Sequence, residues 1–174
     1  MYFETGCRRG ELLGLTWRYV DFKNQTIQIQ CTLVNNPYTY GWDIKSTPKT
    51  AASERIVNIS RENMEYLRFL YEEAKKYDQI FSIDSFVFLN KVNKPYCPKK
   101  VSETFKLACK AVGITKNISL HSTRHTFATK MLNNNIPIPI VQRIGGWGKA
   151  TTLLNVYGHS DDNEAKAAME KVIF

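Results

Sequence analysis

Apolar and polar residues alternate in one part of the chain, which is the pattern of half-buried strands. The clearest alternation runs from Thr26 to Leu33. Turn-forming residues at Asn35-Asn36-Pro37 separate it from a second expected strand at 38–47. Arg55–Ile59 is predicted to be the third strand, and the short apolar run Phe86–Leu89 is expected to be buried. These segments predict one small antiparallel sheet.

Helical periodicity covers most of the remaining chain. Ser60 is a suitable N-cap for an amphipathic helix that reaches about Lys76. Met1–Leu15 is predicted to be the end of another helix, with its leucines turned inward. Five further helices are expected, over Lys99–Val112, His121–Leu132, Pro137–Ile144, Thr151–Tyr157 and Asp161 to about Val172. The fold class predicted is therefore α+β, mostly α-helical, with a small three-stranded antiparallel sheet.

Length and composition narrow the class of protein. A chain of 174 residues fits one domain with a sizeable core. It contains no signal peptide and no apolar run long enough to span a membrane. The four cysteines form no C-x-x-C pair, and the three histidines complete no metal-ligand spacing, so reduced thiols and no metal site are expected. We expect a cytoplasmic protein without a cofactor.

The positive charge of the chain is concentrated in one segment. The net charge is +8 overall. Between Ser85 and Ser160 there are eleven lysines and arginines but one acid, Glu103, so this segment carries +10 and the rest of the chain −2. Such a segment is either a solvated basic face or a surface that binds a polyanion such as DNA.

The candidate chemistry lies partly within the same segment. His121 and Arg124 are three residues apart, so they share one helix face, and Tyr157 follows 33 residues after the arginine. A second arginine, Arg8, stands near the amino end beside Arg9, which is an alternative. Arginine matches phosphate oxygens with a planar fork of donors, and a tyrosine nucleophile needs a base or cationic surroundings. This set suggests phosphoryl transfer to tyrosine.

These residues resemble the motifs of the tyrosine recombinases, the phage integrase family, in family order along nearly the whole chain. Thr5-Gly6-Cys7-Arg8 through Trp17 matches the first motif, which implies that Arg8 is catalytic and that Glu11 supports the site. Pro48–Arg55 is similar to the lysine hairpin, which makes Lys49 the catalytic lysine, with Lys45 as the alternative.

Two further motifs complete the resemblance. His121-Ser122-Thr123-Arg124-His125 matches the second motif, which implies that His121 and Arg124 are catalytic. We expect His125 to be a packed residue or to support these two. Trp147 lies ten residues before Tyr157, where the family usually has a second histidine. We expect Trp147 to be a core residue, a phosphate donor or both, and Tyr157 to be the nucleophile.

The resemblance implies an enzyme for DNA recombination and integration, carried by a phage or another mobile element. Tyrosine attacks the scissile phosphate, a 3′-phosphotyrosyl intermediate forms, and a 5′-hydroxyl leaves, without metal or ATP. Two alternatives stay open: a type IB topoisomerase-like nicking-closing enzyme, and a DNA-binding regulator without chemistry. The expected partners are double-stranded DNA and further copies in a tetrameric synapse. The apolar face of the helix after Asp161 would join the copies, unless that helix belongs to the domain's own core.

Family members also place a helix and a separate DNA-clamping domain before the first motif. We therefore expect residues 1–174 to be the catalytic domain, as a fragment that lacks both, of a bacterial or phage-encoded recombinase. Base recognition depends on few side chains and on DNA shape, so no target sequence is predicted.

Overall fold

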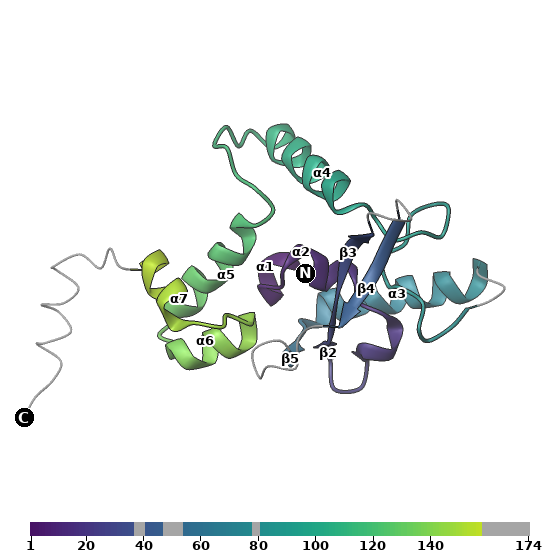
Figure 1. Ribbon diagram of the computed structural model, residues 1–174, viewed down its shortest axis with the longest axis horizontal. Coiled ribbons are helices and arrows are strands. Elements are labelled where there is room, and N and C mark those ends of the chain that lie inside the picture. The colour runs from purple at the N-terminus through teal and green to yellow at the C-terminus, as the bar shows by residue number, and fades with distance from the viewer. Residues whose placement is uncertain (37–40, 47–53, 78–80, 158–174) are drawn as a thin grey trace, which may run out of the picture.

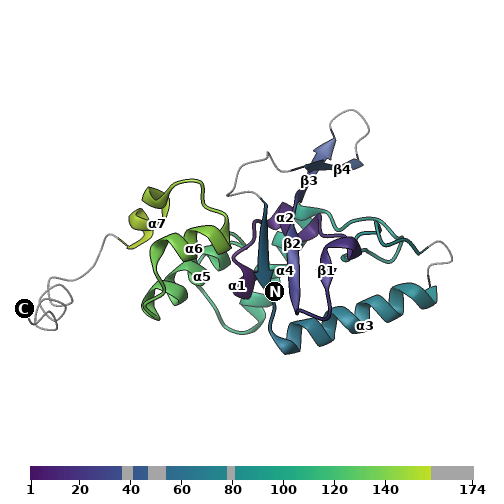
Figure 2. The ribbon, with the colours of Figure 1, turned by 90° about the horizontal axis from the view of Figure 1, so that it is seen from below.

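The computed structural model describes residues 1–36, 41–46, 54–77 and 81–157. In the described part, helices α5 (Ser122–Asn133), α6 (Ile138–Gly145) and α7 (Ala150–Tyr157) gather at one end (Figure 1). The strands and α3 (Arg61–Tyr77) form the other end, and α1 (Tyr2–Thr5) and α2 (Arg9–Leu13) lie between the two (Figures 1 and 2). The predicted fold class, α+β and mostly helical with a small antiparallel β component, is confirmed, but the strands predicted to form one sheet are divided between two.

The strands are divided between two sheets. β1 (Val20–Asp21), β2 (Thr26–Ile29) and β5 (Arg55–Asn58) form an antiparallel sheet in the order β1-β2-β5. β3 (Cys31–Asn36) and β4 (Gly41–Ser46) form a separate antiparallel pair, which projects from the rest of the molecule in Figure 2.

The prediction of a single strand over Thr26–Leu33 is therefore wrong. The chain changes partner at Gln30, because β2 pairs with β5 whereas β3 pairs with β4. Ile27 and Ile29 are buried in β2 and Leu33 in β3, so the alternation of buried positions continues across the break. A pattern of burial gives the face of a strand but not its hydrogen-bonded neighbour.

The prediction of one helix over Met1–Leu15 is also wrong. Gly6 ends α1 in the left-handed conformation, with φ of 59°, and Arg8 is extended before α2 begins. A side chain at Gly6 would be strained at this φ and would also meet the ring of Phe127 at 2.5 Å. The inward placement of Leu12, Leu13 and Leu15 is confirmed, since each is buried.

The later helices begin and end within one or two residues of their predicted bounds. Ser60 accepts a hydrogen bond from the N–H of Asn63 and caps α3. Gly113, with φ of 79°, follows α4 (Pro98–Ala111). Of the run Phe86–Leu89, only Val87 is fully buried. The helix expected after Asp161 lies outside the described residues.

Two hydrophobic cores result from this arrangement. The larger core joins the β1-β2-β5 sheet to α3 through residues such as Ile27, Val57 and Leu67. The smaller core, which contains Phe127 and Trp147, lies among α5, α6 and α7. No helix in the described part of the chain is both long and apolar enough to cross a membrane. The candidate site lies where α2, α5, α6 and β5 meet between these cores.

Candidate active site

Arg8 is held by the first turn of α2. The carboxylate of Glu11 accepts the backbone N–H of Arg8 at 2.8 Å and its Nη1 at 2.7 Å. Glu11 can accept both hydrogen bonds because the chain is extended at Arg8 before the helix starts. The Arg8 side chain remains 49% exposed, whereas that of Glu11 is 2% exposed. Glu11 thus fixes both the backbone and the guanidinium of Arg8, while the side chain stays accessible from the solvent.

Glu11 is buried between two arginines. Arg55, the first residue of β5, donates from Nη2 to Glu11 Oε2 at 2.8 Å, and both side chains are 2% exposed. Burial works to raise the pKa of Glu11, but the hydrogen bonds and charge of Arg55, joined by contacts from Arg8, outweigh it and hold that pKa below its usual range. Glu11 is therefore an anion at neutral pH and supports Arg8, as its position in the motif predicts.

The end of α6 and the residue that follows it bind the arginines. Three consecutive carbonyls there accept hydrogen bonds from three different guanidinium groups. The Ile144 carbonyl accepts from Arg55 Nε at 2.7 Å. The Gly146 carbonyl accepts from Arg8 Nη2 at 2.9 Å and from Arg124 Nη2 at 3.3 Å.

Gly145, between these two residues, provides the third carbonyl, which accepts from Arg124 Nη1. The same nitrogen of Arg124 donates to the Gly6 carbonyl at 2.5 Å. Gly146 ends α6 in the left-handed conformation, with φ of 73°. The backbone thereby turns several carbonyls toward one region.

Arg124 is buried against Trp147. Its guanidinium carbon lies 3.8 Å from the centre of the indole ring. The ring of Phe127 is also stacked with that of Trp147, with 6.5 Å between the ring centres. Burial, followed by the charge of Arg8, lowers the pKa of Arg124 to about 10, so the group keeps its charge at neutral pH. Trp147 is 5% exposed. It packs in the core as expected, and its role as a phosphate donor stays a prediction.

His121 lies at the start of α5 and is exposed, with its ring 5.0 Å from that of His125 in an edge-to-face arrangement. Partial burial, followed by the positive charges of His125, Arg124 and Arg8, lowers the pKa of His121. The imidazole is then neutral at pH 7 and able to accept a proton. Nδ1 of His125 is buried and has no hydrogen-bond partner among the described residues.

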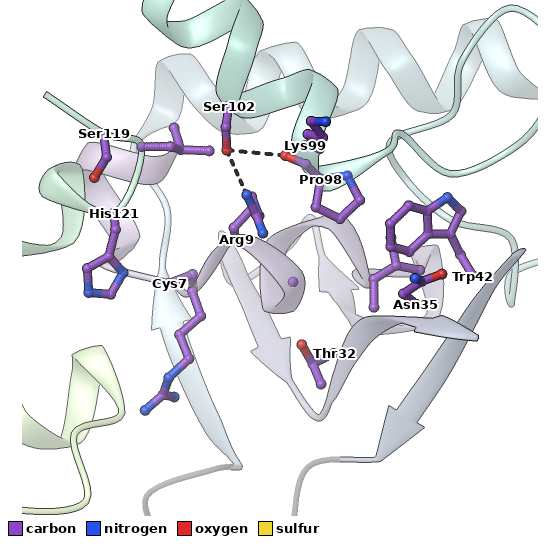
Figure 3. Close-up of a pocket in the computed structure, with 14 residues that line it drawn as sticks. Cys7, Arg9, Thr32, Asn35, Trp42, Pro98, Lys99, Ser102, Ser119 and His121 are labelled. Carbon is purple, nitrogen blue, oxygen red and sulfur yellow. Dashed lines mark hydrogen bonds between the residues drawn. The ribbon is translucent and has the colours of Figure 1, made fainter. Parts of the chain in front are cut away.

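A groove of about 640 Å³ begins at Arg8 and His121 and continues between β3, β4 and the start of α4. Figure 3 shows Arg9 turned toward α4, where its guanidinium donates to Ser102 at 2.7 Å. Trp42 and Lys99 also line the groove. Arg8, not Arg9, therefore makes the contacts with Glu11 and the turn after α6.

Two predicted residues are not placed by the structure. Lys49 lies outside the described residues, and its alternative, Lys45, is an exposed residue of β4. Tyr157 is the last residue of α7, and its side chain lies outside what the structure describes. The structure therefore brings together Arg8, Glu11, Arg124 and Trp147, with His121 beside them, and leaves the roles of Lys49 and Tyr157 as predictions.

Arg55 is the residue of this site that the sequence did not reveal. A signal was present in the alternation of β5, because Arg55, Val57 and Ile59 are buried while Ile56 is 64% exposed. An arginine on the buried side of a strand needs an acidic partner. Glu11, an acid within an apolar helical segment, was the candidate for this acidic partner of Arg55.

Arg8 and Arg124 converge on one carbonyl, and His121 lines the same groove as Arg8, so the structure brings together residues from both ends of the chain. The chain belongs to the phage integrase family, whose model matches residues 1–164. It is 29% identical over 176 residues to the integrase of Staphylococcus phage L54a, covering 98% of this chain and 50% of that protein. It is 30% identical over 182 residues to the transposase of transposon Tn916 from Enterococcus faecalis, covering 97% and 43% respectively.

The fold is also found in a solved relative. The Tn1549 transposon integrase in complex with transposon right end DNA superposes with a TM-score of 0.83 at 27% identity, over 98% of this chain and 56% of that one. The chain thus spans about half the length of the relatives that it matches.

Proposed function

We propose that this chain is the catalytic domain of a site-specific DNA recombinase that integrates or excises a mobile element. The observation that carries the proposal is the convergence of Arg8 and Arg124 on the Gly146 carbonyl, at 2.9 and 3.3 Å. Two guanidinium groups that reach one atom can both reach one phosphate. The phosphate of a scissile diester would face both cations at the end of the groove.

The proposed reaction is a transesterification. The phenol oxygen of Tyr157 attacks the scissile phosphorus, and the bond from phosphorus to the 5′-oxygen breaks. His121 accepts the phenol proton, and Lys49 donates a proton to the leaving 5′-oxygen. The product is a 3′-phosphotyrosyl link and a free 5′-hydroxyl, and attack by another 5′-hydroxyl reverses the step and rejoins DNA. Arg8 and Arg124 stabilise the charge that develops on the non-bridging oxygens.

Double-stranded DNA is the proposed substrate. The groove beside Arg8 is lined by Arg9 and Lys99, and α4 carries further exposed lysines. The relative that resembles this chain in fold, the Tn1549 integrase, is in complex with transposon DNA. A basic groove that ends at the candidate site suits a phosphate backbone that continues past the scissile position.

A nicked suicide duplex tests this function. The short strand beyond the nick diffuses away after cleavage, so the covalent adduct accumulates and is counted on a denaturing gel. The wild-type chain is expected to form the adduct, and Tyr157→Phe to form none while retaining DNA binding, because only the phenol oxygen is lost. A Tyr157→Phe protein that still forms the adduct would disprove the assigned nucleophile. A wild-type chain that binds but never cleaves would favour the DNA-binding regulator.

We also propose that the recombinase assembles as a tetramer on two DNA duplexes through the helix after Asp161. Its sequence places Ala165, Ala168, Met169 and Val172 on one apolar face. Removal of residues 161–174 is expected to abolish assembly of paired duplexes, measured by native gel, while single-duplex cleavage persists. Unchanged pairing after the truncation would contradict this role and favour a topoisomerase-like monomer.

A further inference from the structure

Arg55 and Glu11 form a buried ion pair that reaches the lining of the groove through Arg8 and Cys7. Both side chains are 2% exposed, and Nη2 of Arg55 lies 2.8 Å from Glu11 Oε2. Arg55 is itself fixed at the far side, because its Nε donates to the Ile144 carbonyl at 2.7 Å. It also donates to the sulfur of Cys7 at 3.5 Å. Every donor nitrogen of Arg55 thus has a partner inside the protein.

The contacts form a chain that ends at the groove. Arg55 binds Glu11, and Glu11 binds Arg8 at both its backbone N–H and its guanidinium. Arg8 lines the groove and presents its charge there, beside Cys7, which also lines it. Because the same Glu11 oxygen, Oε2, accepts from Arg55 and from the Arg8 N–H, displacement of the carboxylate would move Arg8 as well.

We propose that Arg55 is a positioning residue for DNA cleavage: its charge fixes the Glu11 carboxylate, which in turn orients Arg8 toward the scissile phosphate. The inference rests on the proposed function, because it concerns how that reaction's first arginine is aligned. Arg55 does not touch DNA in this scheme. Neither the family motifs nor the resemblance assigns it a role.

Stability alone explains the pair poorly. A buried ion pair loses about as much by desolvation as it gains by attraction, and apolar replacements of both partners are often neutral. Arg55 could therefore be an apolar residue of the sheet core if folding were its only task. The extra contacts from Glu11 to Arg8 explain why an anion is kept here, and an anion at this depth needs Arg55.

The contacts from Arg55 through Glu11 to Arg8 form a relay, and the charges around Glu11 determine how this relay depends on pH. Four groups face its carboxylate: Arg8 at the start of α2, Arg55 on β5, Arg124 on α5, and the thiol of Cys7. Burial raises the pKa of Glu11 and Arg55 is the main group that lowers it. Loss of Arg55 should let burial prevail, so Glu11 would take up a proton at a higher pH and release Arg8.

The test compares Arg55→Met with Arg61→Met. Arg61 donates to Glu65 at 2.9 Å, but that pair is exposed, with side chains 85% and 62% accessible. Both variants lose one cation from an ion pair with glutamate, and only the first affects the relay. Arg55→Lys is the conservative variant. Cleavage of the suicide duplex is followed in single turnovers at saturating DNA from pH 6 to 9.

Arg55→Met is expected to cleave about 10²-fold more slowly at pH 6, as for a misplaced catalytic group. Its rate should recover as pH rises through the new, raised pKa of Glu11, because the ionised carboxylate again holds Arg8. Any rise caused by deprotonation of His121 is common to all variants, so each rate is divided by the wild-type rate at the same pH. This ratio should stay near one for Arg61→Met at every pH, since its Glu11 is already ionised. Arg55→Lys should restore most of the rate at pH 6. A pH-independent loss in Arg55→Met would indicate a merely structural role and overturn the proposal.

Two NMR measurements decide the proposal without relying on cleavage. The Glu11 carboxyl carbon should titrate at a higher pH in Arg55→Met than in the wild type or Arg61→Met. The Arg8 guanidinium should rotate slowly in the wild type, and freely in Arg55→Met below that pH. If Glu11 and Arg8 behave as in the wild type, the relay is wrong even if DNA is cleaved. If the wild type cleaves no DNA but both signals change as expected, the proposed function fails while the positioning of Arg8 stands.

If Arg55→Met fails to fold, the double variant Arg55→Met/Glu11→Leu replaces the buried pair with apolar side chains. A merely structural pair predicts that this folded variant cleaves at the wild-type rate with a rigid Arg8. The relay predicts slow cleavage at every pH and a freely rotating Arg8, because no carboxylate remains to ionise.

Discussion

Two groups of positive charge on this protein are built in opposite ways. The arginines of the site, Arg8, Arg55 and Arg124, are fixed by a buried carboxylate and by carbonyls of one turn. The four lysines of α4 are all exposed: Lys99, Lys100, Lys106 and Lys110. A fixed cation can stabilise a transition state of defined geometry, whereas an exposed flexible one mainly attracts and holds a polyanion.

This comparison predicts that the geometry of the side chain matters for the arginines of the site, whereas only the charge matters for the lysines of α4. Arginine and lysine differ little as charges but greatly as donors, because only arginine has a planar fork. Substitutions that keep the charge should therefore damage the site and leave α4 unaffected. Substitutions that remove charge from α4 should weaken binding without changing the rate of the chemical step.

The largest effect is expected for Arg124→Lys. Lysine cannot reach both the Gly6 and Gly146 carbonyls and still stack on Trp147, so the cleavage rate should fall by about 10³-fold, as for arginines that stabilise phosphoryl transfer. Single-turnover adduct formation at saturating DNA measures this loss, and EDTA should not alter the wild-type rate. Arg143→Lys, at an exposed position of α6, is the matched control. Equal rates in Arg124→Lys and the control would mean that Arg124 is not a transition-state contact.

The next largest effect is expected on stability, at the end of α6, where the backbone carbonyls bind the arginines. A Cβ added at Gly145 would lie 1.7 Å from the Trp147 ring, whereas one added at Gly148 would meet nothing within 4 Å. The ring cannot move freely because it is buried and contacts both Arg124 and Phe127. Gly145→Ala is expected to lower the free energy of unfolding by about 2–3 kcal/mol, as overpacked cores do.

Thermal unfolding of Gly145→Ala and Gly148→Ala measures this difference. The first variant should show a lower Tm by about 5–10 °C for a domain of this size, and the second should stay close to the wild type. Similar midpoints in both variants would show that the indole adapts. The tight turn would then be unnecessary for the arginine site.

The sequence predicted those parts of the fold that depend on local chemistry. The cap at Ser60 and the glycine at Gly113 mark helix ends through backbone geometry that few residues adopt, so these bounds could be predicted. The change of partner at Gln30 could not, because alternation continues through it. The break at Gly6 depends on the distant ring of Phe127 and on Arg124, which no local pattern shows.

The same division applies to the candidate site. His121 and Arg124 could be proposed because their spacing places them on one helix face, and Arg8 and Glu11 because they match the first motif of the family that the chain resembles. Arg55 was missed because its partner lies 44 positions away in the sequence, and only the fold joins the two. Charge pairs between distant segments depend on topology, and a single sequence gives topology least directly.

The smallest effect is expected for the lysines of α4, and it tests whether they act through charge alone. Lys106→Gln/Lys110→Gln should weaken DNA binding to a similar extent for all duplex sequences, because phosphate contacts carry no base information. If each lysine neutralises one phosphate, the slope of log affinity against log salt should become shallower by about 1.8. Lys23→Gln/Lys75→Gln, which removes two exposed charges elsewhere, should leave the slope unchanged. Fluorescence anisotropy from low to moderate salt measures both slopes, and equal slopes would remove α4 from the DNA surface. Lys106→Arg/Lys110→Arg should bind as the wild type does, because the exposed face of α4 needs charge but no fixed geometry.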